Sequence, residues 1–299
     1  MCCLFGFYNY SGQKIKCLEN LTNLLAENAV VRGSDAAGIA YNRNRRLVIH
    51  KEAKSACEVN FRHPEDVVCV MGHTRHATQG DKKKNYNNHP FGGACKNANF
   101  ALAHNGVIIN DSELKGQYCL PKTRIETDSY VAVQLLEKKK HLDFENIRFM
   151  SESLNGSFAF SILDSRDALW LVRGDSPLSL VKLPAYKLYI YASTDEILYK
   201  SLIDTALFSE IKRGNFEELK ITQGDIFKIV KNGEIVKDRF KYEDYSNYRW
   251  WDYGVTDDDY IDNLKTAASY QGFSPEDIDI LLGEGFSPEE IEEYIYCTG

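Results

Sequence analysis

The sequence predicts an α+β fold built on antiparallel sheets. Strand-like apolar runs recur from residue 3 to about residue 240, and most of them are joined by short turns. Only a few segments of this region have the 3.6-residue apolar period of a helix. Many consecutive strands interrupted by a few helical blocks are typical of this fold class.

The first part of this region is predicted to alternate strands with one helix. Leu18, Leu21 and Leu25 lie at helical spacing, and Leu24 widens the same apolar face. Short apolar runs before and after this helix indicate strands. These strands are predicted at residues 3–8, 36–41, 46–51 and 67–73.

The second part contains two predicted helices, at residues 128–140 and 142–154. Asn232-Gly233, within the stretch IFKIVKNGEIVKD, predicts a hairpin closed by a two-residue turn, because this dipeptide suits such turns. Further strands are predicted at residues 100–104, 157–163, 168–173, 178–183 and 187–192.

The character of the chain changes near residue 243. The stretch YEDYSNYRWWDYGVTDDDY is rich in aromatic and acidic residues and has no clear period, so it is predicted to be an extended segment or linker. We expect a helix from about residue 257 to 270 after it. The sequence therefore divides into a main domain, residues 2–240, and a segment of linker and small helical tail, residues 241–299.

The tail contains a short repeat, GFSPEDIDILL at residues 272–282 and GFSPEEIEEYI at residues 285–295. Ser274 and Ser287 can each cap a helix, a proline follows at the first helical position, and acidic residues fill the first turn. Two short helices are therefore predicted. They could complete the packing of the main domain or bind a partner.

Composition indicates a globular protein of a reducing compartment. Hydrophobic residues make up 43% of the chain, and the net charge of −7 does not indicate a nucleic-acid partner. The eight cysteines form no CxxC pair. There is no signal-like segment and no apolar run of membrane-spanning length, so we expect a cytoplasmic protein with thiols rather than disulfides, and no membrane partner.

Clusters of polar residues and glycine border the predicted strands. Because loops held by a rigid scaffold usually carry catalytic groups, we expect these clusters to gather at one end of the sheets and form the functional site. They are MCCLFGF at the start of the chain, RGSDAAGIA at residues 32–40, GHTRHATQG at 72–80, NNHPF at 87–91, LAHNGVI at 102–108 and ETDSY at 126–130.

Cys2 directly follows the initiator methionine. A cysteine attacks acyl carbons as a thiolate and needs a base or a lowered pKa to do so. If Met1 is removed, Cys2 carries both a thiol and a free α-amine, whose ordinary pKa of about 7.7–8.0 allows it to accept a proton near neutral pH. One residue can then supply nucleophile and base, which explains a cysteine at this position.

Three further groups fit a site for a free amino acid with an acyl side chain. Asn105-Gly106 can supply a side-chain N–H and a backbone N–H to the oxyanion of acyl transfer. Arg75 can bind a carboxylate through its planar guanidinium. Asp128 can bind an ammonium group.

The ordered motifs resemble the glutaminase domain of class II glutamine amidotransferases, nearest to that of glucosamine-6-phosphate synthase. The family begins MCGIxG and carries RGxDSAG, HTRxATxG, NxHP, HNGxIxN and ETDxE in that order. The matching stretches here are MCCLFG, RGSDAAG, HTRHATQG, NNHP, HNGVIIN and ETDSY, followed by DSRDALWLVRGDSPL, ASTDEIL and QGDI. The resemblance therefore covers about residues 2–230.

The resemblance implies a fold and a reaction. The fold is the N-terminal-nucleophile αββα sandwich, with two antiparallel sheets between helical layers. The reaction is hydrolysis of the glutamine side-chain amide through a thioester on Cys2, with the α-amine as base. Asn105 and Gly106 would form the oxyanion hole. We expect no metal and no cofactor for this reaction.

The resemblance also implies how L-glutamine is held. Arg75 would bind its carboxylate, Thr78 would line the pocket and Asp128 would bind its amino group. Residues 75–83 would close over the substrate. Arg32 would brace the loop behind the nucleophile.

Four of the seven histidines, His73, His76, His89 and His104, lie close together in the sequence. We predict no metal site here, because strand neighbours three apart, such as His73 and His76, point to opposite faces. His89 and His104 are instead expected to orient loops through hydrogen bonds. Arg32 and Asp35 are expected to stabilise a loop as a pair.

The sequence also departs from the family. Cys3 replaces the usual glycine and adds a rival thiol, His76 replaces a tryptophan, and Ser129-Tyr130 replaces Thr-Glu. Only about 60 residues follow residue 240, so an acceptor domain is expected to be absent and the ammonia to be used by a separate protein, or released.

Two other functions stay open at this point. The chain could be an N-terminal-nucleophile amidohydrolase for another amide, or a non-catalytic protein that binds partners through its tail. Arg75 and Asp128 favour a free amino acid as substrate. The nitrogen acceptor and the oligomeric state are not indicated by the sequence.

Overall fold

The computed structural model describes residues 2–242 and 273–288, together with positions 261, 265, 268, 290, 291 and 294. The chain separates into two compact units, residues 1–243 and 244–299, which are described here one at a time. The linker predicted after residue 243 and most of the helix predicted at 257–270 lie outside the described residues; positions 261, 265 and 268 of that helix are helical.

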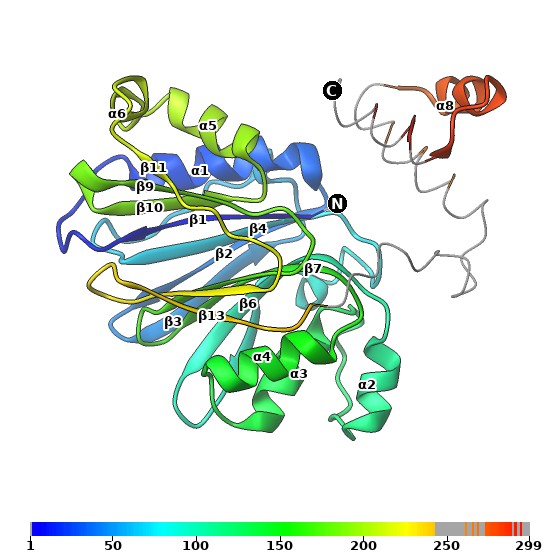
Figure 1. Ribbon diagram of the computed structural model, residues 1–299, viewed down its shortest axis with the longest axis horizontal. Helices are drawn as coiled ribbons and strands as arrows, with labels where there is room; N and C mark the ends of the chain where they lie inside the picture. The colour runs from blue at the N-terminus through cyan, green and yellow to red at the C-terminus, as the bar shows by residue number, and fades with distance from the viewer. Residues whose placement is uncertain are drawn as a thin grey trace. The chain divides into compact units, whose positions relative to one another are not determined.

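The first unit is a sandwich of two antiparallel sheets between two layers of helices (Figure 1). Its first sheet has the spatial order β11 (Glu217–Glu218), β9 (Ser179–Leu183), β10 (Leu188–Ala192), β1 (Cys3–Asn9), β4 (Cys69–Arg75), β2 (Ala36–Arg43) and β3 (Arg46–Glu52). Its second sheet has the order β13 (Ile235–Arg239), β12 (Asp225–Ile229), β8 (Leu169–Arg173), β7 (Gly156–Asp164), β6 (Asn99–Ile108) and β5 (Phe91–Ala94).

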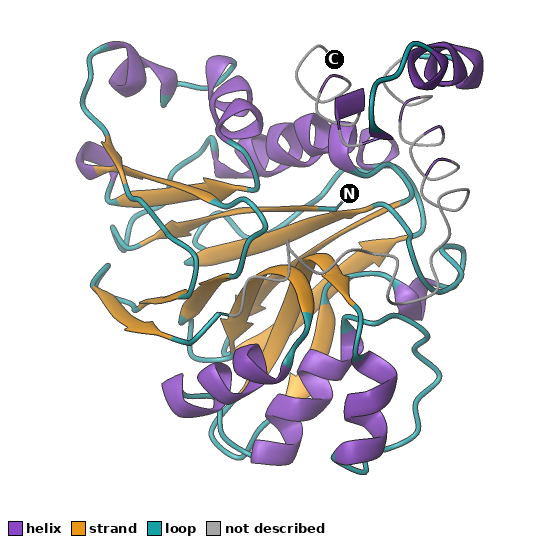
Figure 2. Ribbon diagram, turned by 45° about the vertical axis from the view of Figure 1, so that its right-hand side comes forward, coloured by secondary structure: helices purple, strands orange, loops and turns teal. Residues whose placement is uncertain are grey.

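Helices cover the outer face of each sheet (Figures 1 and 2). The first sheet is covered by α1 (Leu18–Asn28), α5 (Asp195–Ile203) and α6 (Phe208–Lys212), and the second by α2 (Asp111–Gln117), α3 (Tyr130–Lys139) and α4 (Phe144–Ser153). Short 3₁₀ helices occur at Ala29–Arg32, Ala56–Glu58, Asn85–Asn87 and Pro184–Tyr186.

The two-residue period of the strands builds these layers. In β1, Phe5 and Phe7 pack with α1 and α5, whereas Leu4 and Tyr8 pack between the sheets. In β6, Phe100 and Leu102 pack with α3 and α4 on the other side of the molecule. Strands buried on both faces therefore separate three apolar layers, and the predicted α+β sandwich is confirmed.

The structure contains every predicted strand of the first unit and the helices α1, α3 and α4. Sequence reasoning did not identify α2, α5 and α6, which are short. The predicted two-residue hairpin turn is wrong. Val230 N–H donates to the Glu234 carbonyl at 3.0 Å, so three residues form the loop, and Gly233 closes it with φ +80°.

The second unit contains α8 (Pro275–Gly283), whose predicted cap is present. The Ser274 side chain accepts from Asp277 N–H at 3.2 Å, and the Asp277 carboxylate accepts from Ser274 N–H at 2.7 Å. Ser287 and Glu290 form the same reciprocal pair at 3.2 and 2.8 Å. None of the helices in the described parts of the chain has both the length and the apolarity to span a bilayer.

Gly38 in β2 gives a test of the packing in the first unit. A β-carbon at this position would lie 2.3 Å from the His89 carbonyl oxygen, which is backbone and cannot turn aside. We expect Gly38→Ala to lower the free energy of unfolding by about 1–3 kcal/mol, measured by urea denaturation. Gly116→Ala is the control, because a β-carbon there meets nothing within 4 Å and should leave stability unchanged or slightly higher. Equal stability of the two variants would contradict this packing.

Candidate active site

Cys2 lies directly before β1, beside the end of β4. Its thiol donates to the His76 carbonyl at 3.4 Å, and Arg32 Nε donates to the Cys2 carbonyl at 3.1 Å. Burial raises the pKa of the Cys2 thiol, and the nearby Arg75 charge opposes this effect. The thiol is therefore protonated at neutral pH and needs a base to become a nucleophile.

Cys3 points to the opposite face of β1. It is completely buried among the apolar side chains that pack with α1, and its thiol donates to the Leu4 carbonyl at 3.3 Å. Burial raises the pKa of the Cys3 thiol. Cys3 is thus a core residue and does not share the environment of Cys2.

Arg75 is the last residue of β4 and is buried. Its guanidinium donates to Asn88 Oδ1 at 2.6 Å and to the carbonyls of Gln79 and Gly80 at 2.5 and 3.2 Å. These contacts fix the guanidinium beneath the loop of residues 76–82. Thr78, in the same loop, is exposed.

Asp35 ties this loop to the start of β2. Its carboxylate accepts from Ala77 N–H at 2.9 Å and from Lys82 Nζ at 2.6 Å. Burial alone would raise the pKa of Asp35, but these hydrogen bonds hold it below its ordinary value. Arg32 thus contacts the backbone at Cys2, and Asp35 contacts the loop of residues 76–82.

Asp128 lies just before α3 and is buried. Its Oδ2 accepts from Ile108 N–H at 2.7 Å, and its Oδ1 accepts from Ser129 Oγ at 3.3 Å. Asp128 thereby joins the ETDSY segment to the end of β6. The Asp128 charge raises the pKa of the Cys2 thiol and the Arg75 charge lowers it, so both groups lie near enough to Cys2 to act on it.

Asn105 lies on the inter-sheet face of β6. Its Nδ2 donates to Ser193 Oγ at 3.4 Å, and Ser193 Oγ accepts from Leu4 N–H at 2.9 Å. Gly106 follows with φ +136°, and a β-carbon there would lie 2.1 Å from the Ser157 carbonyl oxygen, so only glycine fits. Sequence reasoning missed Ser193; the ASTDEIL stretch contained it, but nothing local distinguishes a serine that bridges two sheets.

Three buried histidines lie close together. Two of them form hydrogen bonds through their rings, and the third packs against other rings. His73 Nε2 contacts the His104 carbonyl at 2.9 Å, and His104 Nδ1 contacts Ser129 Oγ at 2.8 Å. The His89 ring forms no hydrogen bond with the described residues. It packs at a tilt against His73 and edge-on against Phe91, with ring centroids 4.1 and 4.4 Å apart. The predicted hydrogen-bonding role of His89 is therefore wrong, because its ring is enclosed by other rings.

Burial lowers the pKa of His73 to about 3 and that of His89 well below its ordinary value, so both rings are neutral at physiological pH. No group of three or more potential metal ligands occurs among the residues that the structure describes.

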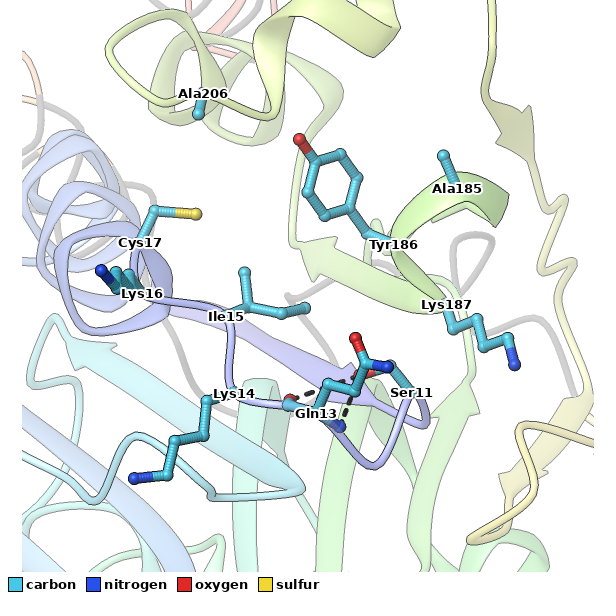
Figure 3. A pocket seen from close by; sticks show the side chains of 10 residues that line it. All are labelled: Ser11, Gln13, Lys14, Ile15, Lys16, Cys17, Ala185, Tyr186, Lys187 and Ala206. Carbon is cyan, nitrogen blue, oxygen red and sulfur yellow. Dashed lines mark hydrogen bonds between the residues drawn. The ribbon is translucent and has the colours of Figure 1, made fainter.

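The described first unit also has a cavity of about 600 Å³ that contains none of the predicted site residues (Figure 3). It borders the segment that follows β1, at the end of that strand away from Cys2. Its lining comprises Ser11, Gln13, Lys14, Ile15, Lys16, Cys17, Ala185, Tyr186, Lys187 and Ala206.

Comparison with known proteins identifies a family for part of the chain. Residues 73–200 match the family described as a glutamine amidotransferase domain. Residues 73–200 therefore belong to a glutamine amidotransferase domain. The match contains Arg75, Asn105 and Asp128, and the resemblance predicted from the ordered motifs is confirmed.

Two relatives of this amidotransferase chain are glutamine–fructose-6-phosphate aminotransferases (isomerizing). The enzyme of Staphylococcus aureus strain Mu50 is 34% identical over 194 residues, and that of Bacillus cereus is 33% identical over 186 residues. Each alignment covers 60% of this chain and 30% of the relative. The chain thus spans about a third of the length of these relatives.

Solved structures show the same fold. The glutamine phosphoribosylpyrophosphate amidotransferase of B. subtilis has a TM-score of 0.61 at 23% identity, over 81% of this chain and 50% of that one. A structure described as the allosteric regulatory enzyme of purine biosynthesis has a TM-score of 0.62 with the same coverage and identity. These similarities establish the amidotransferase fold of the first unit.

The different environments of the cysteines predict their reactivity. Cys57 and Cys119 are exposed, whereas Cys3 is buried and has a raised pKa. During brief treatment with iodoacetamide at neutral pH, we expect Cys57 and Cys119 to react at least about tenfold faster than Cys3, measured by peptide mass spectrometry. Modification of Cys3 as fast as Cys57 would contradict its position in the core.

Proposed function

We propose that this chain hydrolyses the side-chain amide of L-glutamine to glutamate and ammonia, with Cys2 as nucleophile. The observation that carries the proposal is that Cys2, Arg75 and Asp128 share one region, with Asn105 held on the inter-sheet face. The names of the aminotransferase relatives also point to glutamine as nitrogen donor.

The proposed base is the α-amine of Cys2 after removal of Met1. Burial raises the pKa of the Cys2 thiol and keeps it protonated, so attack needs a base beside it. The α-amine has an ordinary pKa of about 7.7–8.0, so part of it is unprotonated near neutral pH and can accept this proton as the sulfur attacks. The sulfur then attacks the amide carbon and forms a tetrahedral intermediate. Its collapse breaks the C–N bond, the amine returns the proton to the leaving ammonia, and a thioester is left. Water then hydrolyses this thioester to glutamate and restores the thiol.

The developing oxyanion would be bound by Asn105 and Gly106. Such a donor is worth roughly 100- to 1000-fold in rate when it is held in place before the reaction. The contact between Asn105 and Ser193 supports this role, because it ties the amide group to the strand that carries Cys2. No cofactor enters the proposed reaction.

Arg75 would bind the α-carboxylate of glutamine and Asp128 its α-ammonium group. Both are buried, so their charges are screened little by water. The exposed Thr78 would line the pocket when the loop of residues 75–83 closes over the substrate. Arg32 would keep the Cys2 carbonyl in place. His89 would support this loop region by packing.

We assign the glutaminase activity to residues 2–240 and treat residues 241–299 as a separate linker and helical tail. The ammonia would be used on an acceptor bound by another protein. The aligned part covers 30% of the aminotransferase relatives, which fits a shared glutamine-hydrolysing part. A cytoplasmic location would keep the nucleophilic thiol reduced.

The proposed roles of Arg75 and Asp128 in binding glutamine can be tested by substitution. We expect Arg75→Gln and Asp128→Asn to raise the KM for L-glutamine by about tenfold or more, because each removes a charged hydrogen bond worth about 1.5–3 kcal/mol. Hydrolysis of a simple primary amide should change little. Arg43→Gln and Asp66→Asn are matched controls at exposed positions. Normal glutamine kinetics in both site variants would favour another amide substrate, and loss of folding would be detected by thermal melting.

A further inference from the structure

Lys51, in β3, is a half-buried amine that the proposed reaction does not use. Its Nζ donates to the carbonyl oxygens of Asn88 and Pro90 at 2.5 and 3.2 Å. It also lies 5.0 Å from the centre of the Phe91 ring. No carboxylate of the described residues forms an ion pair with Lys51. Among the described residues, its charge is therefore stabilised by two backbone carbonyls of the NNHPF segment and by the Phe91 ring.

Gly38 leaves space for the contact between Lys51 and the NNHPF backbone. Gly38 in β2 is the register partner of Lys51 in β3. A β-carbon on Gly38 would lie 2.3 Å from the His89 carbonyl oxygen and 2.7 Å from Lys51 Cβ. The missing side chain lets the NNHPF backbone lie on these two strands. Asn85 Nδ2 also donates to the Lys51 carbonyl at 2.6 Å, so Lys51 is fixed to the neighbouring segment at both its backbone and its amine.

Asn88 connects Lys51 to Arg75, the proposed ligand of the substrate α-carboxylate. The backbone oxygen of Asn88 accepts from Lys51, and its side-chain Oδ1 accepts from Arg75 Nη1 at 2.6 Å. Its Nδ2 donates to the Lys82 carbonyl at 3.1 Å, in the loop over the site. Asn88 is completely buried, so it cannot move without disturbing these partners. Asn88 therefore contacts both the Lys51 amine and the Arg75 guanidinium.

The positive charges of Lys51 and Arg75 also link these two residues. Burial, followed by the charge of Arg75, lowers the pKa of Lys51 to about 8. Two cations thus repel each other in this region. An anion bound to Arg75 would relieve that repulsion.

We propose that Lys51 is a positioning residue for the α-carboxylate of the substrate, acting through Asn88 on Arg75. This inference rests on the proposed function and deepens it. Lys51 need not touch the substrate. Its loss should weaken recognition of the carboxylate while leaving the attack by Cys2 nearly unchanged.

The test compares Lys51→Met, Lys51→Arg and Lys54→Met, where Lys54 is an exposed lysine of the same segment. Two ligands are used, L-glutamine and 4-aminobutanamide, which lacks the α-carboxylate. Binding is measured by calorimetry in a Cys2→Ala background, and kcat and KM are measured with Cys2 present. Thermal melting checks that each variant is folded.

We expect Lys51→Met to raise the dissociation constant and the KM for L-glutamine by about tenfold, or about 1.4 kcal/mol, with kcat within about twofold. Its effect on 4-aminobutanamide should be small. Lys51→Arg should restore most of the glutamine affinity, because a guanidinium can donate to both carbonyls. Lys54→Met should behave as the parent protein.

Unchanged glutamine affinity in Lys51→Met would overturn the role of Lys51 and leave the proposed function intact. Equal losses for both ligands would also overturn it, because they would indicate general damage to the site. A lower kcat with unchanged KM would contradict a role in carboxylate recognition. Failure of the Cys2→Ala protein to bind L-glutamine at all would overturn the proposed function, and the role of Lys51 with it.

Discussion

The pleat of β1 is the constraint on which the arrangement of this site depends. Consecutive residues of an extended chain point to opposite sides, so Cys3, the first residue of β1, and Cys2, directly before the strand, lie in different environments. Cys3 packs with α1 in the core, and Cys2 lies beside Arg75 and Asp128. A shift of one residue in the register of β1 would exchange the two thiols and every apolar contact of the strand. The packing of Phe5 and Phe7 with the helices therefore also decides which thiol is available for chemistry.

The same period orients the other groups of the site. Met71 in β4 and Ala103 in β6 pack between the sheets, so Arg75 and Asn105, an even number of residues further along, lie on the same faces. The loops then connect these strand ends. Asn88 joins Arg75 to the loop and to β3, while Ser193 joins Asn105 to β1. The polar side chains are thus held by buried contacts that span both sheets, and such contacts fix the geometry of a site.

Much of this fold follows from local patterns, and some of it does not. The strands and α3 could be predicted because their apolar periods are clear and long. The candidate site residues could be named because of their chemistry. Cys2 can act as a nucleophile, and the HNG, HTR and ETDSY segments contain groups that can bind an oxyanion, a carboxylate and an ammonium group. The contacts of Lys51, Asn88 and Ser193 could not be predicted, since they form between segments distant in sequence. The environment of the His89 ring could not be predicted either, because a sequence does not show whether a ring packs against other rings or forms hydrogen bonds.

The central claim is that Cys2 becomes the N-terminal residue and attacks glutamine. The most direct measurement is peptide mass spectrometry after incubation with a diazoketone analogue of glutamine. It reports removal of Met1 and the site of covalent attack together. We expect an adduct on an N-terminal Cys2, and we expect excess L-glutamine to prevent its formation. An adduct on Cys3, or a retained Met1 with no adduct on any cysteine, would contradict it.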